Sequence, residues 1–193
     1  MVSEACMRKI IASLLVALVV LLPIEQARAD VPEPAVRSHD VVATRTDQGF
    51  TVDVAFVVQV PVSVAWAVIT DFQHMAEFLP NLVLSQVLER SQQGLRVRQK
   101  GATRFGPFHF DFEYIRDIQV FPESELRAHG VGGNFKRVDS ITRLSAVAGG
   151  TRLEYHVEAQ PDFWVPPLIG PLILRDQTAD QFSALVDEMI RRR

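Results

Sequence analysis

Cysteine is almost absent from this chain of 193 residues, which has Cys6 as its only one. A single cysteine cannot form an intramolecular disulfide framework, so the folded part must obtain its stability from a hydrophobic core. The five histidines show neither the H-x-x-x-H nor the H-E-x-x-H spacing of helical zinc sites. We therefore expect no bound metal and no cofactor.

A surplus of basic residues is also lacking. The 20 lysines and arginines are outnumbered by 23 acidic residues, which gives a net charge of −3. This balance argues against nucleic acid as a partner, because no basic surplus is available to neutralise phosphates. The basic cluster at residues 191–193 is explained more simply by the favourable position of cations at a helix C-terminus than by binding to anionic lipid.

The common catalytic motifs are missing as well. Ser63 and Ser140 lack the G-x-S-x-G context of a nucleophile elbow. The glycine-rich residues 130–134 lack the third glycine of a dinucleotide fingerprint and begin no evident helix. We interpret them as a flexible connection between two strands near a cavity rim. The sequence predicts no catalytic residue.

One long hydrophobic run is present, at residues 10–22. As a helix it would be about 20 Å long, which is short of the roughly 30 Å hydrocarbon core of a bilayer. Pro23 ends the run, and Ala27-Arg28-Ala29 supplies a small-x-small cleavage pattern, so residues 1–29 are predicted to be a signal peptide. An uncleaved anchor is the alternative. We expect export across the inner membrane to the periplasm.

Residues 30–40 contain prolines without apolar periodicity and are predicted to be a flexible leader. The remaining residues, 41–193, form one predicted domain. Alternation of apolar and polar side chains over residues 50–60 and 105–118 predicts strands with one buried face and one solvated face. Further strands are predicted at residues 41–45, 82–90, 95–101, 125–129, 138–146 and 151–160.

Helical signals flank these strands. Pro61 suits the first turn of a helix, Asp71 can cap a short segment at residues 73–79, and Pro80 ends that segment. Residues 168–192 are predicted to form a long amphipathic helix with a potential kink at Pro171. Its apolar stripe consists of Phe182, Leu185, Val186, Met189 and Ile190. One long helix against one curved antiparallel sheet of about seven strands gives an α+β fold.

The order of these elements resembles the helix-grip fold of the START-like (SRPBCC) superfamily, which includes the polyketide cyclase/dehydrase-like and coenzyme Q-binding families. Three short sequence segments are also similar to those of the superfamily: V-P-V-S-V-A-W-A-V-I-T-D-F at 60–72, F-L-P-N-L at 78–82 and G-G-T-R-L-E-Y at 149–155. The resemblance covers residues 41–192. It implies a cavity between sheet and C-terminal helix that binds lipids, isoprenoids, polyketides or hormones and sometimes catalyses cyclisation. Fold alone does not choose among these functions.

In the alternation of their predicted strands, Gln99, Tyr114 and Tyr155 fall on the same inward-facing side as the apolar residues. A buried amide or phenol needs a hydrogen-bond partner, which a ligand, a trapped water or another core group could equally provide. Together with the aromatic strip and two helical residues, they form the predicted set of cavity residues: Trp66, Gln99, Phe108, Phe110, Phe112, Tyr114, Tyr155 and Phe182.

A dense apolar run follows the last strand. It either packs beneath the sheet or forms a partly exposed gate that touches a membrane transiently while a ligand passes. The gate candidates are Phe163, Trp164, Leu168 and Ile169.

The sequence thus favours an exported protein that binds a hydrophobic small molecule or lipid, such as an isoprenoid, a quinone or a fatty-acid-like ligand, without catalysis. A cyclase or hydratase acting on a polyketide-like substrate is one alternative, and it would need an acid–base pair inside the cavity. An envelope assembly module that binds a partner peptide is another. An empty internal cavity of several hundred Å³ would favour a ligand-binding protein or an enzyme over such a module.

Overall fold

The computed structural model describes residues 36–92, 94–106, 108–166 and 169–193. The predicted signal peptide at residues 1–29 and the first part of the predicted leader, residues 30–35, lie outside these ranges. Among the helices that are described, none has both the length and the apolar character needed to cross a bilayer.

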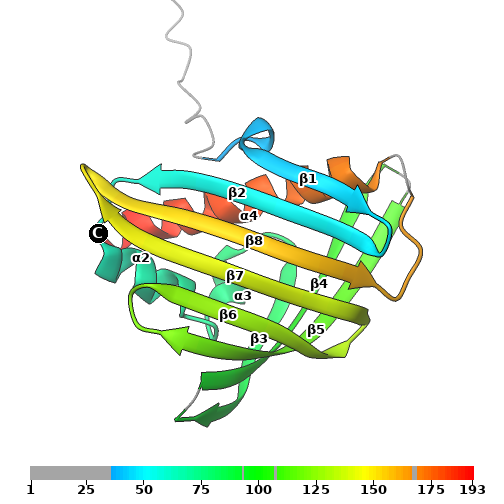
Figure 1. Ribbon diagram of the computed structural model, residues 1–193, viewed down its shortest axis with the longest axis horizontal. Helices are drawn as coiled ribbons and strands as arrows, with labels where there is room; N and C mark the ends of the chain where they lie inside the picture. Colours follow the sequence, from blue (N-terminus) through cyan, green and yellow to red (C-terminus); the bar gives the residue numbers. More distant parts are fainter. Residues whose placement is uncertain (1–35, 93, 107, 167–168) are drawn as a thin grey trace, which may run out of the picture. The chain divides into compact units, whose positions relative to one another are not determined.

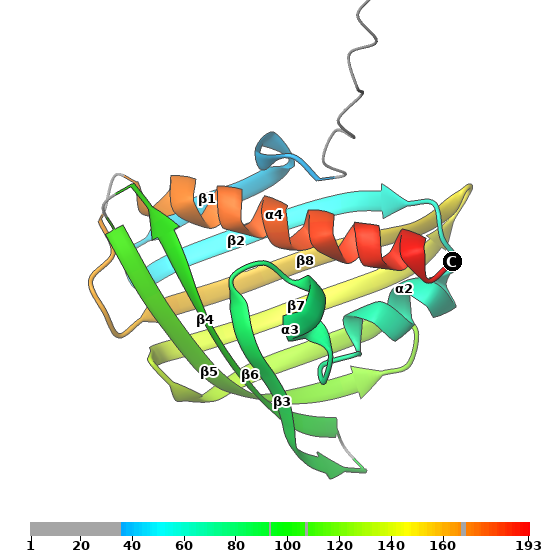
Figure 2. The ribbon, with the colours of Figure 1, turned by 180° about the vertical axis from the view of Figure 1, so that it is seen from behind.

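Eight antiparallel strands form one sheet in the spatial order β1-β2-β8-β7-β6-β5-β4-β3. The sheet is curved (Figure 1), and α4 crosses its concave face beside α2 and α3 (Figure 2). This is the predicted α+β helix-grip fold, with eight strands rather than about seven. The elements are η1 (Ser38–Asp40), β1 (Val41–Thr46), β2 (Gly49–Val58), α2 (Val62–Ile69), α3 (Met75–Phe78), β3 (Leu82–Ser91), β4 (Gly94–Phe105), β5 (Phe108–Phe121), β6 (Glu125–Gly133), β7 (Phe135–Val147), β8 (Gly150–Pro161) and α4 (Gly170–Arg191).

Alternation along the strands decides which side chains face the helix. On β2, Val52 and Val54 are buried while Asp53 and Ala55 are exposed, as expected for period two. On α4, the predicted stripe is buried except at its end, where Ile190 is 57% exposed. Burial of each such side chain contributes about 1.5–3 kcal/mol, so the contact between α4 and the sheet stabilises the fold.

The prediction for residues 130–134 is wrong, because most of them belong to β6, which continues to Gly133. A Cβ on Gly130 would come within 2.6 Å of the Val138 side chain on the neighbouring strand. Gly133 has a φ of 107°, in the region that favours glycine. These glycines therefore mark close approach of strands rather than a loop.

Other boundaries also differ from the prediction. β4 continues to Phe105 and the hairpin turns at Gly106, so the predicted strand at residues 105–118 had included the end of β4. Pro171 lies in the first turn of α4, where its missing N–H costs nothing, and therefore belongs to the helix start rather than to a kink. Asp71 does not cap α3, since its carboxylate is paired with His74 and Arg192 instead.

The described part of the predicted leader, residues 36–40, is anchored at Val36, whereas Arg37, His39 and Asp40 are exposed. Val36 is only 1% exposed. Its N–H donates to Ser183 Oγ on α4 at 3.1 Å, and the Ser183 hydroxyl donates back to the Val36 carbonyl oxygen at 2.8 Å. Residues 36–40 are thus part of the folded domain, because α4 supplies hydrogen bonds that no local pattern predicts.

An ionic cluster fastens the C-terminal end of α4 to the segment between α2 and α3. Arg192 lies 2.9 Å from Asp71 Oδ2 through Nη1 and donates through Nε to Glu188 Oε1 at 2.5 Å. Asp71 Oδ1 also lies 2.6 Å from His74 Nδ1. Hydrogen bonds from Arg191 and Arg192 lower the pKa of Glu188 from its ordinary 4.5 to about 2. The cluster stabilises the fold only while these carboxylates are ionised.

Replacing Glu188 by Gln is expected to reduce the free energy of unfolding by about 1–3 kcal/mol at neutral pH, because charge-assisted hydrogen bonds are lost. The pKa of Glu188 is depressed in the folded state, so its contribution is full above about pH 4.5 and is lost as the pH falls towards about 2. Urea denaturation across this pH range should show a shallower loss of stability in Glu188→Gln than in the wild type.

Glu154→Gln is the matched control, because Glu154 is an exposed carboxylate whose partner Arg152 donates to it at 2.9 Å on β8. Its effect should stay within about 0.5 kcal/mol at every pH. Equal effects of the two substitutions on the free energy of unfolding would show that Glu188 stabilises the fold no more than an exposed carboxylate does.

Candidate functional site

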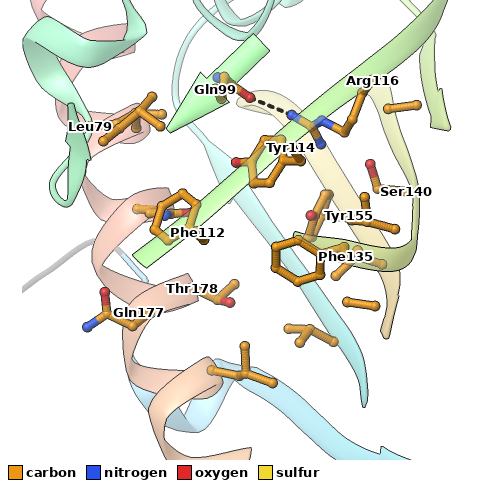
Figure 3. Close-up of a pocket in the computed structure, with 18 of the residues that line it drawn as sticks. Leu79, Gln99, Phe112, Tyr114, Arg116, Phe135, Ser140, Tyr155, Gln177 and Thr178 are labelled. Carbon is orange, nitrogen blue, oxygen red and sulfur yellow. Dashed lines mark hydrogen bonds between the residues drawn. The ribbon is translucent and has the colours of Figure 1, made fainter. Parts of the chain in front are cut away.

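A cavity of about 310 Å³ lies between the concave face of the sheet and α4. The seven strands from β2 to β8 contribute to its wall, together with α2, α3 and α4. Most of the wall is apolar, with polar side chains gathered at a few points. Figure 3 shows Gln99, Tyr114 and Arg116 close together, with Gln177 and Thr178 on the α4 side.

Six of the predicted cavity residues line this space: Gln99, Phe110, Phe112, Tyr114, Tyr155 and Phe182. Trp66 does not, so its assignment is corrected. It packs against the core from α2, where Ala65, Val68 and Ile69 occupy the buried side and Ile69 reaches the cavity. The side chain of Phe108 lies outside what the structure describes. Contact of any of these residues with a ligand stays a prediction.

The gate candidates separate into different environments. Phe163 lines the cavity, whereas its neighbour Trp164 is 66% exposed. Ile169 is half-buried at the start of α4, and Leu168 lies outside the described residues. The segment after β8 therefore presents one aromatic ring to the cavity and the next one to the surface.

One wall of the cavity is a continuous row of aromatic rings. Phe112 stacks on Tyr114 with centroids 5.8 Å apart, Tyr114 meets Phe135 edge-on at 6.1 Å, and Phe135 meets Phe163 edge-on at 5.7 Å. Such pairs stabilise one another beyond the area that they bury. Gly101 makes room for this wall, since a Cβ there would lie 2.3 Å from the Phe112 ring.

Arg116 is a charged cavity residue that the sequence did not single out. It lies on β5 in the same alternation as Phe110, Phe112 and Tyr114, and it lines the cavity with them. Its guanidinium carbon lies 4.5 Å from the centroid of the Tyr114 ring, within cation–π distance. If the alternation of inward-facing residues is continued past Tyr114, the next position is Arg116, although a charged residue at an inward-facing position is unusual.

A directed chain of hydrogen bonds positions Arg116. The Ser85 hydroxyl donates to the Phe72 carbonyl oxygen, so it accepts from Gln99 Nε2 at 3.0 Å. This fixes the orientation of the Gln99 amide, whose Oε1 accepts from Arg116 Nη2 at 2.6 Å (Figure 3). Gln99 is only 2% exposed. The hydrogen-bond partners that a buried Gln99 was expected to need are therefore protein groups, Ser85 and Arg116, and the Gln99 amide orients the Arg116 side chain.

The second polar feature of the cavity is Tyr155 on β8. Burial raises the pKa of its phenol to about 12, against smaller opposing effects of the Arg116 charge and a hydrogen bond with Ser140. Its ring also packs 5.2 Å from that of Phe182 on α4. Tyr155 is thus a neutral hydroxyl at neutral pH, able to donate or accept a hydrogen bond.

Two buried polar atoms of the wall have no hydrogen-bond partner among the described residues, Arg116 Nε and Thr103 Oγ1. Arg116 is also without an ion pair within 4.0 Å in the part of the chain that is described, whereas Arg96 and Arg98 on the outer face are paired with Asp117 and Glu113. Buried polar groups are ordinarily satisfied, so each exception needs an explanation.

The profile of the family described as "Polyketide cyclase / dehydrase and lipid transport" matches residues 58–182, which is more than half of the chain. No curated protein matches the sequence significantly.

Solved structures share the fold at low sequence identity. A STAR-related lipid transfer protein from Xanthomonas axonopodis has a TM-score of 0.63 at 12% identity, over 78% of this chain and 92% of that one. A START superfamily protein from Mycobacterium smegmatis has a TM-score of 0.62 at 13% identity, over 73% and 97%. The Zhui aromatase/cyclase from Streptomyces sp. R1128 has a TM-score of 0.55 at 16% identity, over 74% and 95%. Identities this low establish the fold alone.

The raised pKa of Tyr155 can be measured directly, because the chain has only two tyrosines. In Tyr114→Phe, Tyr155 is the sole tyrosine, and its phenolate absorbance should appear with a midpoint near pH 12. The same variant unfolded in denaturant should titrate near the ordinary value of about 10. Circular dichroism at each pH verifies that the fold persists. A folded-state midpoint near 10 would contradict the burial of this phenol.

Proposed function

The chain belongs to the polyketide cyclase/dehydrase and lipid transport family, and we propose that it binds a hydrophobic small molecule or lipid in the cavity between the sheet and α4. The observation that carries this proposal is the cavity itself. Its volume of about 310 Å³ lies at the lower end of the range for ligand pockets, about 300–1,000 Å³. A fatty-acid-like, isoprenoid or quinone ligand with one chain or a small ring system suits that space.

The driving force is removal of apolar ligand surface from water. Each methylene group that enters the cavity contributes about 0.8 kcal/mol. The aromatic wall and the aliphatic side chains of α4 supply the contacts, and the few polar groups set the orientation of the ligand. The same cavity argues against an assembly module, for which a filled core is expected.

A cyclase or hydratase is the second candidate, because the related Zhui structure is an aromatase/cyclase. Acid–base catalysis needs a group that exchanges protons near neutral pH inside the cavity. Among the described wall residues, the ionisable side chains are Tyr114, Arg116 and Tyr155. Phenols and guanidinium groups keep their protons at neutral pH in ordinary circumstances. This composition favours binding over proton-transfer chemistry.

Export is part of the proposal. The apolar run at residues 10–22, with Pro23 and the Ala27-Arg28-Ala29 pattern after it, supports a periplasmic carrier that receives and delivers its ligand at a membrane. The segment after β8 is the proposed point of transient membrane contact. Trp164 is exposed there, and its neighbour Phe163 lines the cavity. At this point of the chain, the protein surface and the cavity wall are therefore only one residue apart, which suits entry of an apolar ligand.

Ligand binding is tested with the matched pair Val157→Phe and Val57→Phe. Val157 lines the cavity on β8, whereas Val57 is exposed on the outer face of β2. The added ring at 157 should displace ligand contacts equivalent to about two methylene groups, which weakens binding about tenfold or more. The probe is the neutral apolar dye N-phenyl-1-naphthylamine, followed by fluorescence.

Val57→Phe should bind the dye as the wild type does, and thermal unfolding verifies that both variants are folded. Lipids co-purifying with the wild type are identified by native mass spectrometry. Absence of dye binding by the wild type, together with repeated recovery of empty protein, would overturn the proposed function.

Membrane contact is tested with Trp164→Asp against Ile190→Asp. Both positions are exposed and apolar, and they lie near opposite ends of α4. Loss of an inserting tryptophan should lower partitioning onto phosphatidylglycerol-containing vesicles about tenfold, whereas the change at Ile190 should have little effect. Unchanged sedimentation of folded Trp164→Asp with vesicles would defeat the membrane-contact proposal.

A further inference from the structure

The polar end of the cavity is built around one cation. Of the N–H groups of Arg116, one donates to Gln99 Oε1 at 2.6 Å, while Nε is buried and has no acceptor among the described residues. None of the described aspartates and glutamates pairs with this guanidinium within 4.0 Å. A cation held in apolar surroundings without a counter-charge is unfavourable unless something else compensates it.

The arginine is nevertheless held firmly in this place. The chain of hydrogen bonds from Phe72 through Ser85 to Gln99 presents a carbonyl oxygen to Arg116, and the Tyr114 ring lies 4.5 Å from its guanidinium carbon. A side chain fixed in this way loses little freedom when a ligand arrives, which strengthens binding. These contacts orient the guanidinium without neutralising its charge.

Hydrogen-bond donors of other residues line the same cavity. Ser140 and Tyr155 carry hydroxyl groups, and Figure 3 shows both side chains on the side of the cavity where Arg116 lies. A guanidinium with neighbouring hydroxyls matches the acceptor-only character of a carboxylate, which arginine binds well through its planar set of N–H groups. One cation also matches one negative charge, whereas a phosphomonoester carries about −1.5 to −2.

We propose that the Arg116 end of the cavity binds the carboxylate of a single-chain amphiphile, such as a fatty acid. The hydrocarbon chain then lies along the aromatic wall from Tyr114 through Phe135 to Phe163, towards the segment that leads into α4. A cavity of about 310 Å³ suits one chain rather than two. This inference rests on the proposed function and adds the chemical class of the ligand and the direction in which it lies.

The test compares dodecanoate with 1-dodecanol, which have equal chains and differ in charge, by isothermal titration calorimetry at neutral pH. The wild type is expected to bind dodecanoate about tenfold or more tightly than the alcohol, as a charge-assisted hydrogen bond in a desolvated site implies. Arg116→Gln keeps an amide donor for Gln99 but removes the charge, so it should bind both ligands about equally. Arg116→Lys keeps the charge and should retain the preference.

Arg98→Gln is the matched control, because Arg98 lies on β4 with its guanidinium paired to Glu113 on the outer face of the sheet. It should preserve the preference for dodecanoate. Equal affinities of the wild type for both ligands, or a preference that survives in Arg116→Gln, would overturn the carboxylate assignment while leaving the proposed function intact. Failure of the wild type to bind either ligand or the neutral dye would overturn both.

Discussion

One helix cannot fill the concave face of an eight-stranded sheet, and the cavity follows from this constraint. Neighbouring strands lie about 4.8 Å apart, so eight strands span about 34 Å, whereas a helix with its side chains is about 10–12 Å across. α2 and α3 cover a further part of the face (Figure 2). The space of about 310 Å³ that remains is walled by the sheet and α4 and is available to a guest molecule.

The hydrogen bonds that lead to Arg116 run in one direction. The Phe72 carbonyl, the Ser85 hydroxyl and the Gln99 amide form a chain in which each group has a fixed direction, and the chain ends on a cation. Buried networks of this kind stabilise a fold only when their members are satisfied. Within the part of the chain that the structure describes, Arg116 Nε is the atom of this network without a hydrogen-bond partner, at the wall of the cavity. Stability alone does not account for that arrangement, which is why we propose that this group recognises an anion.

The two ends of α4 make different polar contacts. At the C-terminal end Arg192 pairs with Asp71, and Glu188 holds the side chains of Arg191 and Arg192 within the same end of the helix. Towards the N-terminal end, Gln177 accepts a hydrogen bond from Asn81 at 2.6 Å, and the segment before the helix carries Phe163 and Trp164. The helix is thus held by an ion pair at its C-terminal end and by a neutral hydrogen bond beside the cavity towards its N-terminal end.

The sequence by itself determined the architecture and the faces of its elements. Alternation and helical periodicity arise from local geometry and burial, so they placed Gln99, Phe112, Tyr114 and Tyr155 on the inner face correctly. The same alternation includes Arg116, which lies two residues beyond Tyr114, where the predicted set of cavity residues on this strand ended. It could not show that Trp66 misses the cavity or that the glycines at 130–133 lie within a strand.

Only the tertiary structure decided which side chains meet. Gln99 contacts Ser85 and Arg116, which are 14 and 17 residues away, and Ser183 holds Val36 across 147 residues. Such partners depend on strand register and on the curvature of the whole sheet. These properties are set by many distant contacts at once, and a local pattern of residues therefore does not contain them.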